Sequence, residues 1–216
     1  MDPRLKKWLG WLDIIKLEVQ DLVMAKHMFG EVRSMIGNNP TIRVDNSYYR
    51  YLANSYASHA IIGVRRQIKV DPQSVSLARM LREMSETPEI VSRKYYVSLY
   101  KGSAVEDLAD GDFNRYADPG APHIRASMMV EDLKLLTNRT AKCEEYADKR
   151  VAHRDKREPK EPPTYDEVDS CIDLLDALYV KYFGLFHASH LDTLLPTWQY
   201  DWKAIFHTSW LPQVKT

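Results

Sequence analysis

The sequence predicts an all-α protein, an antiparallel helical bundle with additional helices. Apolar residues recur at intervals of three and four along most of the chain, which is typical of amphipathic helices. No segment of useful length alternates apolar and polar residues as a half-buried strand does, and only 42–44 and 95–99 are weak strand candidates. We therefore expect a single helical domain over residues 1–216.

The N-terminal half of the chain predicts four helices separated by clear breaks. The first ends before the Gly-Asn-Asn-Pro motif at 37–40, and the second covers about 47–69, before Asp71-Pro72. Ser74 or Ser76 is expected to cap a third helix, and a fourth should begin near Pro88, because proline suits a first helical turn. The first helix carries one apolar stripe: Leu5, Trp8, Leu12, Ile15, Val19, Leu22 and Phe29.

The C-terminal half predicts two longer helices after a polar, turn-rich surface loop at about 102–122, which has room for one short helical turn. One helix runs from about 121 towards 153, and Thr164 and Glu167 form a capping-box signature for the next. The aromatic tail at about 191–216 is expected to pack across the bundle or against a partner. The two stripes are Met129, Leu133, Leu136, Thr140, Cys143, Ala147 and Val151, then Val168, Ile172, Leu175, Tyr179, Tyr182 and Phe186.

Composition excludes several classes of protein. The 30 basic and 30 acidic residues give a net charge of zero, which argues against a surface that is basic overall, although a local patch is allowed. Cys143 and Cys171 lack the spacing of a zinc site, so we expect buried thiols of a reducing compartment, with a disulfide left open. No apolar run suggests a signal peptide or a membrane span, and the scattered glycines form no phosphate loop. We expect a cytoplasmic protein without metal or cofactor.

One face of the helix after 121 is basic and ends in a histidine. Residues 139–160 contain eight lysines and arginines and five aspartates and glutamates, which gives this segment an excess of three positive charges. Arginine binds phosphate oxygens, tyrosine stacks on bases, and histidine exchanges protons near neutral pH. The alternative is a charged face that is merely solvated. The aligned residues are Arg139, Lys142, Tyr146, Lys149, Arg150 and His153.

Arg65 and Arg66 lie within an otherwise apolar helix, so at least one must reach a partner or the surface. They would form either an internal ion pair or a second basic wall of a site.

The run Tyr-Ala-Asp-Lys-Arg-Val-Ala-His-Arg-Asp at 146–155 resembles the signature of the HEPN superfamily. It is most similar to the AbiU-like abortive-infection branch, whose helix reads roughly R-D-K-x-x-A-H-x-D. Residues 64–67 with Asp71, and 76–81 followed by Pro88, are similar to the same branch. The resemblance implies a HEPN-type bundle that often dimerises, from a prokaryotic defence or toxin–antitoxin system.

Active HEPN members are metal-independent endoribonucleases with an arginine four to six residues before a histidine; others bind RNA or nucleotides, or serve as scaffolds. The resemblance implies His153 as the acid or base and Arg150 as the phosphate-holding group. Ala147 stands where the family has its arginine. Two hypotheses follow, an RNA-binding protein with a degenerate nuclease motif and an inert dimerisation or scaffold protein. The residues implied in RNA binding are Arg65, Arg66, Arg139, Lys142, Tyr146, Lys149, Arg154 and Asp155.

Overall fold

The computed structural model describes residues 1–151 and 161–210. Within these ranges the chain is helical, without a strand, and the single β-bridge pairs Ser92 with His123. The all-α prediction is therefore confirmed. The elements are α1 (Pro3–Asn38), α2 (Ser47–Ile68), α3 (Leu77–Glu86), the 3₁₀ helix η1 (Pro88–Ile90), α4 (Arg93–Ser98), the 3₁₀ helix η2 (Glu106–Leu108), α5 (Ala109–Phe113), α6 (Ala126–Tyr146), the π-helical turn η3 (Ala147–Val151), α7 (Tyr165–His187) and the 3₁₀ helix η4 (Trp202–His207).

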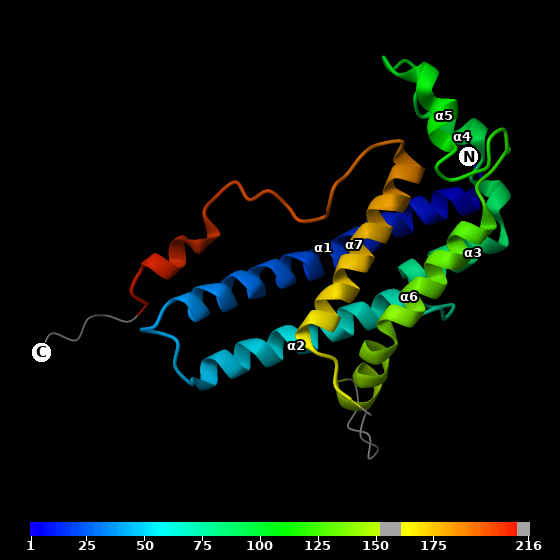
Figure 1. Cartoon of the computed structure of the whole chain (residues 1–216). Coiled ribbons are helices and arrows are strands. Elements are labelled where there is room, and N and C mark those ends of the chain that lie inside the picture. The colour runs from blue at the N-terminus through cyan, green and yellow to red at the C-terminus, as the bar shows by residue number, and fades with distance from the viewer. Residues whose placement is uncertain (152–160, 211–216) are drawn as a thin grey trace, which may run out of the picture.

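Helices α1 and α2 form a long antiparallel pair (Figure 1). Asp2 caps α1 by accepting a hydrogen bond from the Arg4 backbone N–H at 2.7 Å, and Pro3 occupies the first turn. At 1.5 Å per residue, the 36 residues of α1 span about 54 Å. Every residue of the stripe predicted for this helix is buried, which confirms the periodicity argument.

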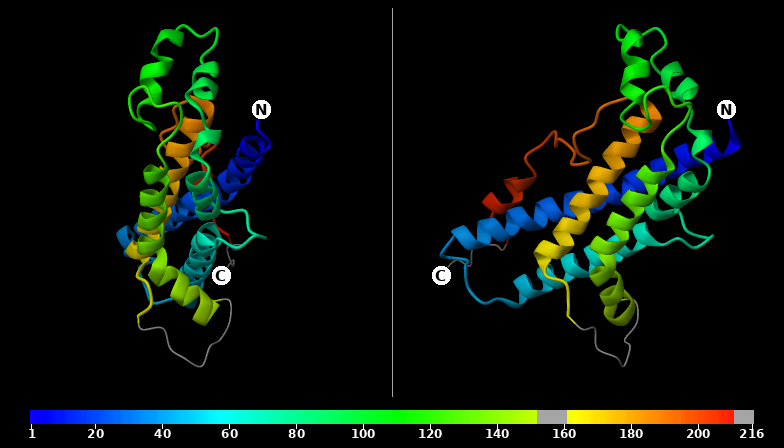
Figure 2. Two further views of the ribbon diagram at one scale, coloured as in Figure 1. Left: turned by 90° about the vertical axis from the view of Figure 1, so that its right-hand side faces the viewer. Right: turned by 45° about the vertical axis from the view of Figure 1, so that its right-hand side comes forward.

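A second antiparallel pair, α6 and α7, crosses the first (Figures 1 and 2). Helix α7 packs against α1 and α2, and α6 packs against α2 and α3. The predicted capping box starts α7: the Thr164 hydroxyl accepts from the Glu167 backbone N–H at 3.2 Å, and the Glu167 carboxylate accepts from the Thr164 N–H at 2.7 Å. All six residues of the stripe predicted for α7 are buried.

The start of α6 and the regularity of its last turns differ from the prediction. The helix begins at Ala126 rather than near 121, and its regular α-helical part ends at Tyr146. The π-helical turn η3 follows, with the Ala147 N–H bonded to the carbonyls of Cys143 and Glu144. A π-helical turn is wider than an α-helical one and therefore breaks the spacing of three and four residues.

Short helices replace the expected loop at 102–122. Helices η2 and α5 lie there, and Phe113 and Ala117 are fully buried. Asp112 on α5 accepts hydrogen bonds from the hydroxyls of Tyr96 and Tyr100, the latter at 2.6 Å. These contacts attach the segment to α4, which covers most of the weak strand candidate at 95–99; residues 42–44 likewise form no strand. Only a 3₁₀ helix begins at Pro88.

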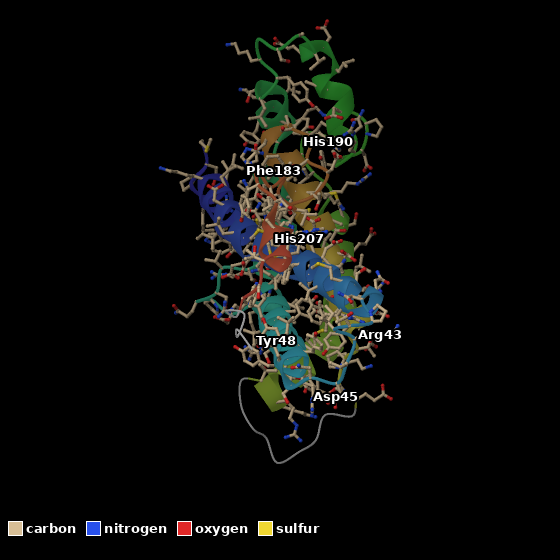
Figure 3. The ribbon with its side chains drawn as sticks, turned by 90° about the vertical axis from the view of Figure 1, so that its left-hand side faces the viewer. Arg43, Asp45, Tyr48, Phe183, His190 and His207 are labelled. Atoms are coloured by element: carbon tan, nitrogen blue, oxygen red, sulfur yellow. The ribbon has the colours of Figure 1, made fainter. Side chains whose placement is uncertain are left out.

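The aromatic C-terminal segment turns back along α1 (Figure 3). The Trp198 ring stacks on His27 with centroids 5.1 Å apart, and Lys203 on η4 forms an ion pair with Glu31. The C-terminal segment was expected to pack across the bundle or against a partner, and its described part packs against α1 of the same chain. None of the helices over 1–151 and 161–210 combines the length and the apolar character that crossing a membrane requires.

Candidate binding groove between α6 and α7

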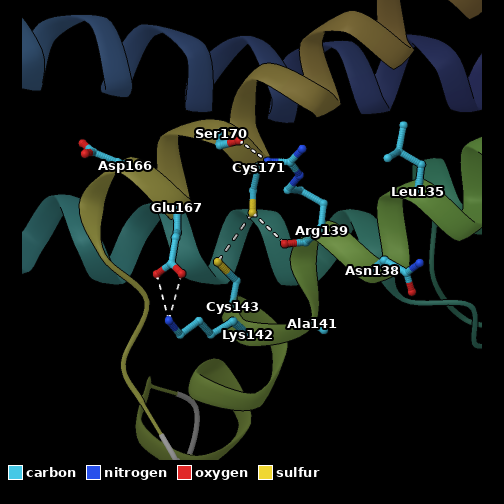
Figure 4. A pocket seen from close by; sticks show the side chains of 10 residues that line it. All are labelled: Leu135, Asn138, Arg139, Ala141, Lys142, Cys143, Asp166, Glu167, Ser170 and Cys171. Atoms are coloured by element: carbon cyan, nitrogen blue, oxygen red, sulfur yellow. Dashed lines mark hydrogen bonds and ion pairs between the residues drawn. The ribbon is translucent and has the colours of Figure 1, made fainter.

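The basic face of α6 borders an open groove of about 610 Å³ that α7 closes on its other side (Figure 4). Helix α6 contributes cations to one wall, helix α7 contributes carboxylates and a hydroxyl to the other, and two sulfur atoms lie between them. The lining of the groove as a whole is therefore mixed in charge rather than uniformly basic. The lining residues are Leu135, Asn138, Arg139, Ala141, Lys142, Cys143, Asp166, Glu167, Ser170 and Cys171.

Arg139 and Lys142 are the predicted RNA-binding residues that the groove brings together. The Arg139 side chain is exposed and donates to the neutral Ser170 hydroxyl at 3.0 Å. Lys142 instead donates to both carboxylate oxygens of Glu167, at 2.8 and 3.1 Å, and forms an ion pair with Glu161 at 3.3 Å. The bond to Glu167 raises the pKa of Lys142, with a smaller contribution from Glu161.

Tyr146, Lys149 and Arg150 lie beyond the groove, at the C-terminal end of α6 and in η3. Tyr146 is half-buried and packs against the core, and Lys149 forms an ion pair with Glu145 at 2.6 Å. Arg150 is half-buried. The part of the predicted basic face beyond Lys142 therefore lies outside the groove, and Ala147, which belongs to the predicted apolar stripe, is buried in the core as expected.

Two ion pairs connect the end of α2 to the end of α6. Arg65 pairs with Asp148, and Lys69 pairs with Glu144 at 3.4 Å. Arg65 on α2 and Lys69, the C-cap residue of α2, lie four residues apart, and so do the two acids of the partner segment, so the two pairs form a ladder. Of the two interpretations of Arg65, the structure favours the internal ion pair.

Arg66 lies apart from this site. Its side chain is exposed and lines a small hollow of about 110 Å³ together with Glu18 and Asp21 of α1 and His59 of α2. The two adjacent arginines thus point to different parts of the surface, as consecutive residues of a helix do.

His153, Arg154 and Asp155 lie outside the described residues. The assignment of proton transfer to His153 and of phosphate binding to Arg154 therefore stays a prediction. Among residues 1–151 and 161–210, no cluster of three or more histidine, cysteine, aspartate or glutamate side chains could hold a metal ion.

The structure confirms the expected burial of the two cysteines and adds that they face each other across the groove. Cys143 was placed on the buried stripe of its helix, and Cys171 directly precedes Ile172 on the buried stripe of the next. Both are buried, and their Sγ atoms lie 3.8 Å apart. Periodicity places each residue on the inner face of its helix, but their shared level depends on how the two helices pack.

We compared the chain with models of known families, with curated proteins and with solved structures, and none of the three comparisons found a match. The arguments for function therefore rest on the groove and on the resemblance of 146–155 to the HEPN signature.

Proposed function

We propose that the chain is a HEPN-like protein of the AbiU-like type that binds single-stranded RNA or a nucleotide through phosphate contacts in the groove between α6 and α7. One observation carries the proposal: the exposed Arg139 guanidinium stands at an open groove of about 610 Å³ with Lys142 beside it. These two cations were selected from the sequence for their chemistry, independently of any groove.

Arg139 is suited to be the primary phosphate contact. Its contact in the groove is a neutral hydroxyl, that of Ser170, rather than a carboxylate. A phosphate oxygen can replace or join that hydroxyl without separating an ion pair, and the guanidinium can present two parallel N–H groups to it. Ser170 then orients the guanidinium towards the groove.

Lys142 plays a secondary part, because a phosphate must displace the carboxylates that neutralise it. Glu161 and Glu167 have side chains that are 78% and 45% exposed, so this exchange takes place in water, where ion pairs contribute little. We therefore expect moderate affinity that falls steeply with salt concentration. Tyr146 would offer only the exposed part of its half-buried ring for stacking on a base.

Fluorescence anisotropy with a labelled single-stranded RNA tests the proposal. The variant Arg139→Glu/Lys142→Glu should lose binding, because two attractive contacts become repulsive. The matched control is Lys94→Glu/Lys101→Glu, which makes the same change in net charge at two exposed lysines near α4. Equal affinity of the two double variants would remove the groove from the proposal.

In the catalytic version of this proposal, the chain also cleaves the bound RNA as a metal-independent endoribonuclease with a degenerate motif. His153 would transfer the proton of the ribose 2′-hydroxyl or of the leaving oxygen, and Arg150 would hold the scissile phosphate. A general acid or base contributes about 10²- to 10⁴-fold in rate, so His153→Ala should reduce RNA cleavage by that factor without changing the melting temperature. Cleavage should persist in EDTA. If the wild-type chain did not cleave RNA, only the RNA-binding part of the proposal would remain.

The second candidate function is an inert dimerisation or scaffold protein, in which two copies of the chain associate. It is favoured by exposed apolar side chains where α1 turns into α2, at the end of the molecule marked by Tyr48 in Figure 3. Val44, Tyr48 and Tyr51 are between 53% and 67% exposed there. Light scattering at micromolar concentration should then give the mass of a dimer, and Tyr48→Ser/Tyr51→Ser should give a monomer.

A further inference from the structure

Two thiols face each other across the groove, one from each of its helices. Cys143 lies on α6 and Cys171 on α7, each is 1% exposed, and their Sγ atoms are 3.8 Å apart (Figure 4). Both residues line the groove between the two helices. The dithiol is thus buried by its neighbours but adjacent to an opening that admits small molecules.

The sulfur atoms need to approach only a little to form a bond. A disulfide has an S–S distance of about 2.05 Å, so the gap must close by roughly 1.8 Å. Rotation about the Cα–Cβ bonds moves sulfur over such distances, while the helices α6 and α7 already hold the two residues together. Twenty-eight positions separate the cysteines in the sequence, so packing rather than sequence proximity creates this pair.

We propose that Cys143 and Cys171 are a site of oxidative modification, at which a hydroperoxide converts the two thiols into an intramolecular disulfide that joins α6 to α7 beside the groove. This inference is independent of RNA binding, because it concerns the two sulfur atoms and not the cations that line the same groove.

Cys171 is the thiol that reacts first. The S–H of Cys143 can donate to its sulfur, which lowers the pKa of Cys171 against the opposing effect of burial, and the Arg139 charge acts in the same direction. The same hydrogen bond, together with burial, raises the pKa of Cys143. Since the thiolate is the nucleophilic form, the pair has one attacking and one resolving cysteine.

The two steps balance with hydrogen peroxide as the oxidant. The Cys171 thiolate attacks one peroxide oxygen, the O–O bond breaks, and the departing hydroxide takes up the thiol proton as water, leaving a sulfenic acid on Cys171. The Cys143 sulfur then attacks the Cys171 sulfur, the S–O bond breaks, and the leaving hydroxide takes the Cys143 proton as a second water. Two thiols are oxidised and one peroxide is reduced to two waters.

The bond would stiffen the wall that carries Arg139. The Cys171 S–H lies in position to donate to the Arg139 backbone carbonyl at 3.4 Å, and this donor is lost on oxidation. Closing the 28-residue loop also restricts the unfolded chain. In the chain-entropy account this corresponds to a rise in melting temperature of roughly 7–14 °C for a domain of this size, if the bond forms without strain.

Peptide mapping of the wild-type chain tests the proposal without any substitution. The folded protein is treated with hydrogen peroxide, its remaining thiols are blocked in denaturant, and it is digested with trypsin. We expect a species in which peptide 143–149 is linked to peptide 161–181, on a monomer in a non-reducing gel, with both peptides separated again by dithiothreitol. The oxidised chain should melt at the higher temperature stated above.

Two results would overturn the proposal. Recovery of both cysteines as blocked thiols, or as sulfinic acids without a linked species, would show that the pair does not close in the folded chain. The order of attack is tested in the wild-type chain, where the hydrogen bond between the thiols is intact: a reagent selective for sulfenic acids, added together with peroxide, should label peptide 161–181 at a higher rate than peptide 143–149. Equal rates would refute the role of Cys171 as the first nucleophile. Neither readout involves RNA, so failure here leaves the binding proposal intact, and the reverse holds as well.

Discussion

Ala147→Arg is the substitution that most sharply tests the placement of the HEPN-like motif in this fold. Active HEPN members carry an arginine at the matching position, so the change would restore their spacing before His153. In the structure, however, Ala147 is 0% exposed and lies at the start of the π-helical turn, packed within the core. An arginine there has no room and no water.

The expected loss of stability has two parts. Inserting a large side chain into a packed core costs about 1–3 kcal/mol, and burying a charge without an oppositely charged partner costs about 3–5 kcal/mol. The whole domain is stable by only about 5–15 kcal/mol, so the variant should lose a large fraction of its free energy of unfolding. Its melting temperature should fall by roughly 10 °C or more.

Urea denaturation and thermal melting measure this effect, with Ala141→Arg as the matched control. Ala141 lies on the same helix but is exposed, so the same chemical change there should alter the free energy of unfolding by less than about 0.5 kcal/mol. If both variants were as stable as the wild-type chain, Ala147 would not be in the core, and the extension of the buried stripe into the π-helical turn would be wrong.

Three further predictions concern the packing that supports the groove. Thr164→Ala removes the capping box of α7 and should lower the free energy of unfolding by about 1 kcal/mol in urea denaturation; an unchanged midpoint would contradict it. A double-mutant cycle on Arg65→Ala and Asp148→Ala should give a coupling of about 0.5–1 kcal/mol, since their side chains are 27% and 46% exposed; zero coupling would disprove the ladder. Burial and the hydrogen bond to Asp169 raise the pKa of Tyr56, and burial next to Asp132 raises that of Tyr182, above the ordinary 10.0. Folding therefore favours the neutral forms of the two tyrosine hydroxyls. Their contribution to the free energy of unfolding is complete below pH 10 and declines as pH rises above it. Denaturation midpoints measured over an alkaline pH series would show this decline.

Local sequence patterns were sufficient for most of the framework. The stripe of α1 and the stripe of α7 follow directly from the spacing of apolar residues, and the capping box places the start of α7 at Tyr165. Ser76, one of two candidates, is the cap of α3 and accepts from the Arg79 N–H at 3.1 Å. These features depend on contacts within one turn or one face, which the sequence contains.

Features that depend on packing between distant segments could not be predicted in the same way. Phe113 is buried because α4 lies against α5, and its neighbours are polar residues that signal a turn. The π-helical turn after Tyr146 leaves the order of residues unchanged but alters which of them share a face. The spacing still placed Ala147 and Val151 on the core side of this turn, but it could not predict that Lys149 and Arg150 lie outside the groove.

The candidate site, too, could be predicted from the sequence only where it depends on one helix and not where it depends on packing between helices. Counting charges from 139 to 160 predicted a net basic segment, but the count could not include Asp166 and Glu167 of α7, which line the same groove and of which Glu167 pairs with Lys142. The groove is accordingly less basic than the segment alone. The sequence predicted two buried thiols and left a disulfide open, but it could not show that the two thiols lie at the same level of α6 and α7, because that depends on how the helices pack.

The salt dependence of RNA binding tests the central claim most directly. The slope of the logarithm of the affinity against the logarithm of salt concentration counts phosphate contacts, at about 0.7 per contact on a single strand. If Arg139 and Lys142 each hold a phosphate, the variant Arg139→Ala/Lys142→Ala should bind more weakly, with a slope smaller than that of the wild-type chain by about 1.4. A variant with the affinity and the slope of the wild-type chain would show that the groove between α6 and α7 holds no phosphate.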